Sequence, residues 1–286
     1  MARGSLSVSV NSGDVSENTA LISSKKCNRK QRSILHELTK INFWKGVILE
    51  FLSTLLSVMN TCGSTLSLYE PGTGDLYPVP SHITVAICAG WGAIVLVAIG
   101  RHEKGYFNPA ITFGLCVARK ISVLRCILYM IAQTAGGIAG AALLFAFSKE
   151  KIRGNLGAVI LHRDVPAYVG CIIEMILVFL IVVTVLTTID PKNEFTGMSS
   201  PLAIGFASAV GMLMAYPYTG AALNPARALA PGLLMNQLNG QWLYWVGPMV
   251  GAVLAVFAYK YLFTMSEEND DDEDNNEYMK IDSSEV

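Results

Sequence analysis

The chain has 286 residues, a formal net charge of −1 and a mean hydropathy of +0.44, and only 15% of its residues are charged. A soluble domain usually carries about 25% charged residues, and the charges here are concentrated in the tails and a few short clusters. This composition excludes a soluble globular protein, and the near-zero net charge gives no electrostatic basis for a nucleic-acid partner.

Six apolar segments are long enough to cross a bilayer, whose hydrocarbon core accommodates roughly 20 residues of helix. In chain order they lie near residues 44–67, 82–100, 124–147, 167–189, 200–216 and 241–263. The sequence therefore predicts an all-α membrane protein. An even number of spans places both ends of the chain on the same side of the membrane.

The two ends of the chain differ in composition from the apolar domain between them. Residues 1–42 are rich in Ser, Asn and Lys, and residues 265–286 contain the run EENDDDEDNNEY. Such polar blocks are typical of disordered, solvated segments. We expect two disordered tails around a membrane domain at 43–264. The N-terminal tail lacks the apolar stretch of a signal peptide, so the first span is expected to direct insertion.

Lys and Arg residues are distributed unevenly between the loops. The first loop, YEPGTGDLYPVPSH, has none. Basic residues gather before the first span, after the second and before the third, namely Arg3, Lys25, Lys26, Arg29, Lys30, Arg32, Lys40, Lys45, Arg101, Lys104, Arg119, Lys120 and Arg125. By the positive-inside rule both termini are expected in the cytoplasm, with the plasma membrane as the default location. The loop at 148–166 opposes this orientation, since it is predicted to be external and carries Lys149, Lys151, Arg153 and Arg163.

The order of features in the first half of the chain recurs in the second half. A span with a glutamate, Glu50 or Glu174, is followed by another span, by a short segment that begins with Asn-Pro-Ala, and by a Gly-rich span. Each half, about 43–147 and 167–264, holds three full spans, so the second half enters the membrane from the opposite side. Inverted repeats of this kind occur in many transport proteins, with the site where the repeats meet.

The two short segments are half-length helices. They begin with the tripeptides Asn108-Pro109-Ala110 and Asn224-Pro225-Ala226. Each helical pattern then runs for about ten residues, or roughly 15 Å, which is half of a ~30 Å hydrocarbon core. Asn is a favourable N-cap and Pro suits the first helical position. We expect two half-helices that enter from opposite faces and meet near the middle.

Glu50 and Glu174 lie inside apolar spans, where a carboxylate is unfavourable unless it faces the protein interior and has a partner. Their equivalent positions upstream of the two short segments favour a role in accepting hydrogen bonds from the loop backbone. The alternative is a proton or cation site.

The sequence contains little that would support catalysis. Five of the six cysteines lie in apolar segments and are expected to be small buried hydrophobic residues. No CxxC or His/Cys spacing of a metal site and no nucleophile–base pair is present. We therefore expect no enzymatic activity, no metal and no cofactor.

From about Phe43 to Phe263 the chain resembles the major intrinsic proteins, which are the aquaporins and aquaglyceroporins. The resemblance rests on both Asn-Pro-Ala motifs, both glutamates, LAIG at 202–205, YTG at 218–220, NPAR at 224–227 and WVGP at 245–248. It implies six transmembrane helices with two re-entrant half-helices, one pore per subunit and homotetramers in the lipid bilayer. In such a pore Asn108 and Asn224 offer amide donors to the solute, and the positive helix ends disfavour protons and cations.

The resemblance also implies four selectivity-filter positions. They fall at Arg227, at Ala221, at Met212 when counted from LAIG, and at Cys88 when counted back from the first Asn without gaps. A one-residue slip in the last count gives Ala89. Water-selective members resemble one another in having His and Phe at the Met212 and Cys88 positions, so this filter is expected to be wider and less polar.

Three further positions bear on the comparison with the family. Ala228 stands where glycerol channels often have Asp, and Tyr244-Trp245 resembles the water-channel pattern. The stretch from Glu103 to Tyr106 replaces the usual Ser-Gly-Ala-His. This departure raises the expectation that the loop gates the pore.

The sequence thus predicts a passive channel for water and small neutral solutes, glycerol or urea first, that excludes protons and ions. Three alternatives remain at this point. One is a strictly water-selective channel, and one is a secondary transporter that uses Glu50 or Glu174 to couple an ion. The third is an adhesion or signalling protein that keeps the fold without conducting, as the resemblance to some insect relatives implies.

Overall fold

The described part of the chain contains six long helices, and all six are long and apolar enough to cross a membrane. The computed structural model describes residues 36–66, 81–100, 105–191 and 199–263. The long helices are α2 (Ile41–Gly63), α3 (His82–Ile99), α5 (Val123–Phe147), α7 (Ala167–Ile189), α8 (Ser199–Thr219) and α10 (Leu243–Ala258), which continues as η1 (Tyr259–Phe263). Over these ranges no β-strand occurs. The prediction of an all-α membrane protein with six spans is confirmed.

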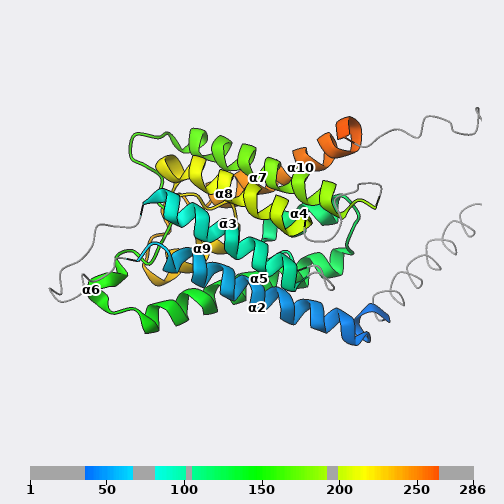
Figure 1. Ribbon diagram of the computed structural model, residues 1–286, viewed down its shortest axis with the longest axis horizontal. Coiled ribbons are helices and arrows are strands. Elements are labelled where there is room, and N and C mark those ends of the chain that lie inside the picture. The colour runs from blue at the N-terminus through cyan, green and yellow to red at the C-terminus, as the bar shows by residue number, and fades with distance from the viewer. Residues whose placement is uncertain (1–35, 67–80, 101–104, 192–198, 264–286) are drawn as a thin grey trace, which may run out of the picture.

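Two short helices lie inside the bundle. They are α4 (Pro109–Val117) and α9 (Pro225–Leu234), with 9 and 10 residues. In Figure 1 they occupy opposite halves of the bundle's length, α9 toward one end and α4 toward the other. A one-turn helix, α6 (Glu150–Arg153), lies in the connection between α5 and α7. Each half of the chain therefore contributes three spans and one half-length helix, as the repeat in the sequence predicts.

The two halves pack as an inverted repeat. The first long helix of each half contacts the last, so that α2 packs on α5 and α7 packs on α10, while α3 packs on α8 between the halves. Each short helix also contacts the last long helix of the other half, α9 on α5 and α4 on α10. The N-terminal end of α2 and the C-terminal end of η1, which continues α10, lie at the same end of the bundle (Figure 1). An even number of spans requires this arrangement.

Glycines allow the closest helix contacts. At Gly136 and Gly140 of α5 a Cβ atom would overlap backbone carbonyl oxygens of α2. At Gly247 and Gly251 of α10 it would overlap backbone carbonyl oxygens of α7. Small residues at this spacing let helix backbones approach closely in lipid, where the hydrophobic effect does not drive helix association. The two Gly-rich spans therefore play the same packing role in the two halves.

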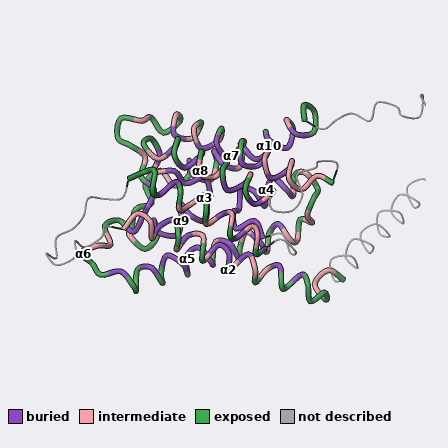
Figure 2. Tube along the Cα trace, viewed as in Figure 1, coloured by how far each residue is buried: buried purple, intermediate pink, exposed green. Residues whose placement is uncertain are grey.

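Apolar side chains cover the outside of the bundle as well as its core. Figure 2 shows exposed residues along the outer faces of the long helices and buried residues toward the short helices. Many of the exposed side chains are large and hydrophobic, including Trp91, Ile131, Phe206 and Phe257. In a soluble protein such a surface would aggregate, whereas here it is suited to contact lipid.

Arg153, in the basic loop at 148–166, has a structural role at the end of α5. Arg153 donates to the backbone oxygen of Ser148 over 2.7 Å, and its guanidinium lies 3.7 Å from the centre of the Phe145 ring. A cation at a helix C-terminus is favourable because the last carbonyls lack helical partners. Arg153 therefore caps the end of α5, which weakens the argument from charge for the orientation of this loop.

Candidate pore

Each short helix begins at an asparagine that caps it. The side-chain oxygen of Asn108 accepts from Ala110 N at 2.9 Å, and that of Asn224 accepts from Ala226 N at 3.0 Å. Both asparagines have extended backbone, and a proline follows each one in the first helical position. This is the local chemistry of a helix start, and it explains why both helices begin at the tripeptide.

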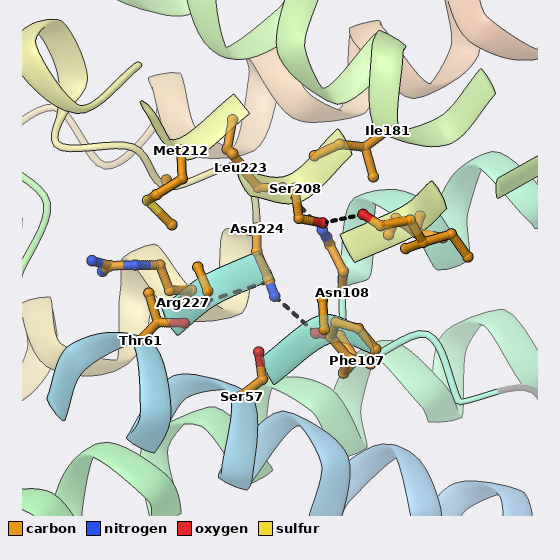
Figure 3. Close-up of a pocket in the computed structure, with 15 residues that line it drawn as sticks. Ser57, Thr61, Phe107, Asn108, Ile181, Ser208, Met212, Leu223, Asn224 and Arg227 are labelled. Atoms are coloured by element: carbon orange, nitrogen blue, oxygen red, sulfur yellow. Dashed lines mark hydrogen bonds between the residues drawn. The ribbon is translucent and has the colours of Figure 1, made fainter. Parts of the chain in front are cut away.

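The two caps are joined to each other's loops. Asn108 Nδ2 donates to the carbonyl of Leu223 at 2.9 Å, and Asn224 Nδ2 donates to the carbonyl of Phe107 at 2.8 Å (Figure 3). Phe107 and Leu223 have φ values of 40° and 53°, a left-handed conformation that is uncommon outside glycine. Each amide carries two hydrogens, so one N–H of each asparagine remains for a molecule in the cavity.

Glu50 holds the loop that leads into α4. Its Oε1 accepts from Tyr106 N and its Oε2 from Phe107 N, both at 2.8 Å. Gln133 of α5 donates to Oε2 at 2.8 Å and also to the hydroxyl of Thr112 in α4 at 2.7 Å. The buried carboxylate thus satisfies backbone donors that have no partner in a helix or a sheet. These donors in turn offset the cost of placing a carboxylate inside an apolar span.

Glu174 holds the loop that leads into α9 in the same way. It accepts from Ala222 N at 3.0 Å, from Leu223 N at 2.7 Å and from the Thr219 hydroxyl at 2.6 Å. Tyr244 completes the set by donating to the Thr219 carbonyl at 2.6 Å. The hydrogen bonds expected between the glutamates and the loop backbone are therefore present in both halves. They occupy both oxygens of each carboxylate.

A cavity of about 60 Å³ lies where the two short helices meet. Its volume is enough for a few water molecules. Its polar lining consists of Ser57, Thr61, Asn108, Ser208, Asn224 and Arg227, and the remaining lining residues are apolar. Both asparagine caps therefore line the cavity, which lies between the two halves of the repeat.

Two of the four predicted filter residues line this cavity. Met212 of α8 and Arg227 of α9 both contribute to its wall and are 4% and 3% exposed. Figure 3 shows Arg227 and Met212 at the same end of the cavity. For Met212 and Arg227, the positions that the family resemblance implies therefore face the cavity.

The count along α3 left Cys88, or Ala89 with a slip of one residue, as the filter position. Ala89 lines the cavity and Cys88 does not. The Cys88 carbonyl instead accepts from Asn60 Nδ2 of α2 at 2.8 Å. Successive residues of a helix differ by about 100° in direction, so the two candidates face different sides of α3, and Cys88 stays a prediction for the filter.

The position before α9, Ala221, also stays a prediction for the filter. Ala221 is fully buried, has a φ of 55° and donates its N–H to the Thr219 hydroxyl at 3.1 Å. It does not line the cavity, whereas the next residue, Ala222, does. The left-handed conformation turns the chain at Ala221, which the count along the sequence does not reveal.

Arg227 is held by the connection between the two halves of the chain. Its Nη1 donates to the carbonyl of Gly157 at 2.8 Å, across 70 residues of sequence. Its buried Nε has no hydrogen-bond acceptor in the described part of the chain. Sequence reasoning missed the contact with Gly157, and no local signal marks it. The guanidinium is therefore fixed at one edge while part of it stays available to a solute.

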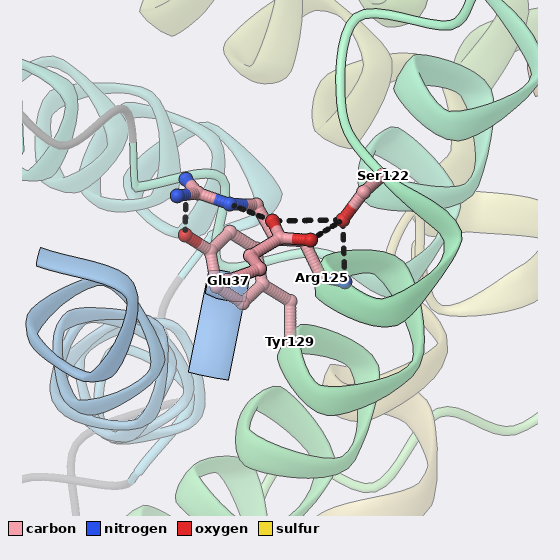
Figure 4. Close-up of polar contacts among 4 residues, drawn as sticks. All are labelled: Glu37, Ser122, Arg125 and Tyr129. Atoms are coloured by element: carbon pink, nitrogen blue, oxygen red, sulfur yellow. Dashed lines mark hydrogen bonds and ion pairs between the residues drawn. The ribbon is translucent and has the colours of Figure 1, made fainter. Parts of the chain in front are cut away.

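A second polar cluster lies at the N-terminal end of α5. Arg125 pairs with Glu37 at 2.8 Å and donates to the hydroxyl of Tyr129 at 3.4 Å (Figure 4). Ser122, the N-cap of α5, donates to both carboxylate oxygens of Glu37 at 2.9 Å. The cluster fixes the segment before α2 to α5. The proposed gating pair, Glu103 and Lys104, lies outside the described residues, whereas Tyr106 is buried at the start of the loop that Glu50 holds.

Comparisons with known proteins agree with this architecture. A family model described as "Major intrinsic protein" matches residues 37–259. Aquaporin-4 of Mus musculus is 38% identical over 223 residues, which cover 77% of this chain and 68% of that protein. Aquaporin-1 of Rattus norvegicus is 35% identical over 227 residues, which cover 79% of this chain and 84% of that protein.

A solved structure shares the fold. The aquaglyceroporin from Plasmodium falciparum matches with a TM-score of 0.66 at 19% identity, over 77% of this chain and 97% of that one. At this identity the likeness concerns the fold alone. The matched family consists of membrane channels rather than enzymes. Together with the paired half-helices and their shared cavity, these comparisons show that the chain belongs to the major intrinsic protein family, the channels of the aquaporin and aquaglyceroporin type.

Proposed function

We propose that this protein is a passive channel for water and small neutral solutes, glycerol and urea first, and that it excludes protons and ions. The observation that carries the solute range is the lining of the cavity to which Arg227 also contributes. Ala89, Ala222 and Met212 line the cavity there, and none of them is aromatic or rigid. Two alanines leave room that a larger side chain would occupy, so the narrowest part of this pore admits solutes larger than water.

Exclusion of cations follows from the positive groups at the cavity. The N-termini of α4 and α9 meet there, and each helix start carries roughly half a positive charge. Arg227 adds a full charge to the wall. A cation that enters the pore loses its hydration and meets this positive potential, whereas a neutral solute does not.

The buried glutamates support a channel over an ion-coupled transporter. Both oxygens of Glu50 and of Glu174 already accept hydrogen bonds from loop backbone. Neither carboxylate lines the cavity. A coupling ion or proton would compete with the contacts that hold the loops, so transport is expected to be independent of pH and Na⁺ gradients.

The remaining assignments follow the family. We infer a homotetramer in the plasma membrane with both ends of the chain in the cytoplasm, and with cytoplasmic tails at 1–42 and 265–286 around the channel domain at 43–264. Residues 1–35 of the first tail and all of the second tail lie outside the described residues. The basic residues before the first span support this orientation.

Stopped-flow light scattering on proteoliposomes tests the proposed function. Vesicles with the purified protein are expected to shrink faster than empty vesicles in a sucrose gradient, and to re-swell faster in glycerol and urea gradients. Re-swelling at the rate of empty vesicles, with fast water exchange retained, would show a strictly water-selective channel. Absence of both responses would point to a non-conducting member with an adhesion or signalling role.

A further inference from the structure

The cavity residues that are fixed by the fold offer mainly hydrogen-bond donors. The side-chain oxygens of Asn108 and Asn224 are used as helix caps, which leaves amide N–H groups toward the cavity. Arg227 has donors and no acceptor. Polyols and amides carry O–H or N–H donors of their own. A pore that only donates would leave those donors unpaired at the narrowest point, which is unfavourable.

The backbone oxygens nearby are already engaged with these same donors. The Leu223 carbonyl accepts from Asn108, and the Phe107 carbonyl accepts from Asn224. The Gly157 carbonyl accepts from Arg227. Each of these three carbonyls keeps a second lone pair, and hydroxyl side chains on the cavity wall would add to the acceptors that a solute can reach.

Two hydroxyls on α2 are suited to this task. Ser57 and Thr61 both line the cavity and are four residues apart, so they lie on one face of the helix. Thr61 is buried and only 5% exposed. Among the described residues neither hydroxyl has a hydrogen-bond partner, although a Ser or Thr within a helix commonly donates to the carbonyl four residues earlier.

Neighbouring hydroxyls behave differently. Ser53 and Thr54 on the same helix donate to the carbonyls of Leu49 and Glu50 at 2.6 and 2.7 Å. Ser208, across the cavity, donates to the carbonyl of Ile204 at 2.8 Å. Figure 3 shows Thr61 near the Arg227 end of the cavity and Ser57 near the asparagine pair, with Met212 and Ser208 on the opposite side.

We propose that Ser57 and Thr61 determine which neutral solutes pass, by presenting hydroxyls that accept hydrogen bonds from the O–H or N–H groups of polyols and amides. The inference deepens the proposed function and rests on it. A solute then bonds to donors on α9 and the asparagine caps and to acceptors on α2, while Met212 and Ile181 face its carbon atoms. Water needs this second set of partners less, because it is small enough to reorient and bond to the next water molecule.

Substitutions at Thr61 separate hydrogen bonding from size. Thr61→Val keeps the shape of the side chain and removes the hydroxyl, whereas Thr61→Ser keeps the hydroxyl and is smaller. If the hydroxyl matters, Thr61→Val lowers glycerol and urea permeability per channel about fivefold, the effect of one lost hydrogen bond, and Thr61→Ser retains it. Ser57→Ala is expected to act like Thr61→Val. Water permeability is measured on the same vesicles and is expected to fall less than glycerol and urea permeability, because a water molecule can also bond to the next water molecule.

The experiment measures water, glycerol and urea permeability in proteoliposomes with channel number determined by quantitative immunoblot. Thr134→Val is the matched control, because Thr134 donates to its own helix at Met130 and does not line the cavity. Equal solute permeability for Thr61→Val, Ser57→Ala and the unmodified protein would overturn the inference and leave the proposed function intact. An order that follows side-chain size, with Thr61→Ser fastest and Thr61→Val equal to Thr, would overturn it as well. An unmodified protein that conducts water but no solute would overturn both.

Discussion

Asn108 and Asn224 are linked reciprocally, since each donates its amide to the carbonyl of the residue that precedes the other: Leu223 at 2.9 Å and Phe107 at 2.8 Å. Each side-chain oxygen meanwhile caps its own helix. One side-chain type therefore starts both half-helices, holds them together and directs a remaining N–H at the cavity. The repeated tripeptide is a joint between the halves as well as a lining of the candidate pore.

Removing either asparagine should loosen this joint. In Asn108→Ala the helix loses its cap and the Leu223 carbonyl loses its donor, so the free energy of unfolding is expected to fall by about 2–3 kcal/mol. The free energy of unfolding of Asn224→Ala should fall by a similar amount because the contacts of Asn224 are equivalent. Thermal unfolding in detergent checks this, with Asn42→Ala as a control at an exposed helical position of α2. A loss confined to one of the two variants would contradict the reciprocal role.

The two glutamates should be equally intolerant of a neutral replacement. In Glu50→Gln or Glu174→Gln an amide NH₂ replaces an oxygen that accepts from a buried loop N–H, which leaves donor facing donor. We expect each variant to lose about 3 kcal/mol or more and to give a low yield of folded protein. Glu150→Gln, at an exposed site on α6, is the control. If both pore glutamates tolerated Gln in a detergent stability assay, their role as loop anchors would be wrong.

The close contact between α2 and α5 should show a sharp dependence on position. Gly140→Ala places a methyl group against a carbonyl of α2, so the helices must separate, with an expected loss of about 2 kcal/mol. Gly63→Ala lies in the same helix pair, but its Cβ would meet only Leu144 at an ordinary 3.7 Å. Unfolding temperatures in detergent should therefore fall for the first variant and stay within about 2 °C of the unmodified protein for the second. Similar values for the two variants would count against the packing argument.

Arg227 should be required for ion exclusion. In Arg227→Val the cavity loses its full positive charge, and we expect proton flux per channel to rise about tenfold or more, because a unit charge at contact distance contributes several kcal/mol. A pH-sensitive dye inside proteoliposomes measures the flux. Arg163→Gln, on the exposed connection before α7, is the control for loss of charge. Unchanged proton flux in Arg227→Val would show that the helix ends alone exclude cations.

Much of the fold could be predicted because its signals are local. Apolar runs of the right length marked the six spans, and the Asn-Pro pairs marked the starts of α4 and α9. The ends were less accurate. The helix α2 stops at Gly63 although the span was predicted to end near residue 67. The helix α8 runs through Pro217 to Thr219 although a proline usually limits a helix. Pairs of glutamates at equivalent places in the repeat were enough to predict the hydrogen bonds to the loops.

The site was harder to predict because its geometry depends on distant contacts. The filter predictions on α3 and before α9, Cys88 and Ala221, each lie one position from a residue that lines the cavity, Ala89 and Ala222. Helix rotation and a left-handed residue determine which neighbour faces the cavity. The contact of Arg227 with Gly157 and the unpaired hydroxyls of Ser57 and Thr61 leave no mark in a linear sequence, since they depend on which faces of α2 and of the 148–166 connection turn inward.

The central claim is that neutral solutes pass because small or flexible side chains line the cavity beside Arg227. Glycerol and water permeability of the double variant Ala89→Phe, Met212→His, compared with the unmodified protein in the same lipid, tests this most directly. We predict that water permeability stays within about threefold while glycerol permeability falls about tenfold or more, because two rings fill the space that the solute needs. Equal glycerol permeability in the variant and the unmodified protein would contradict the claim.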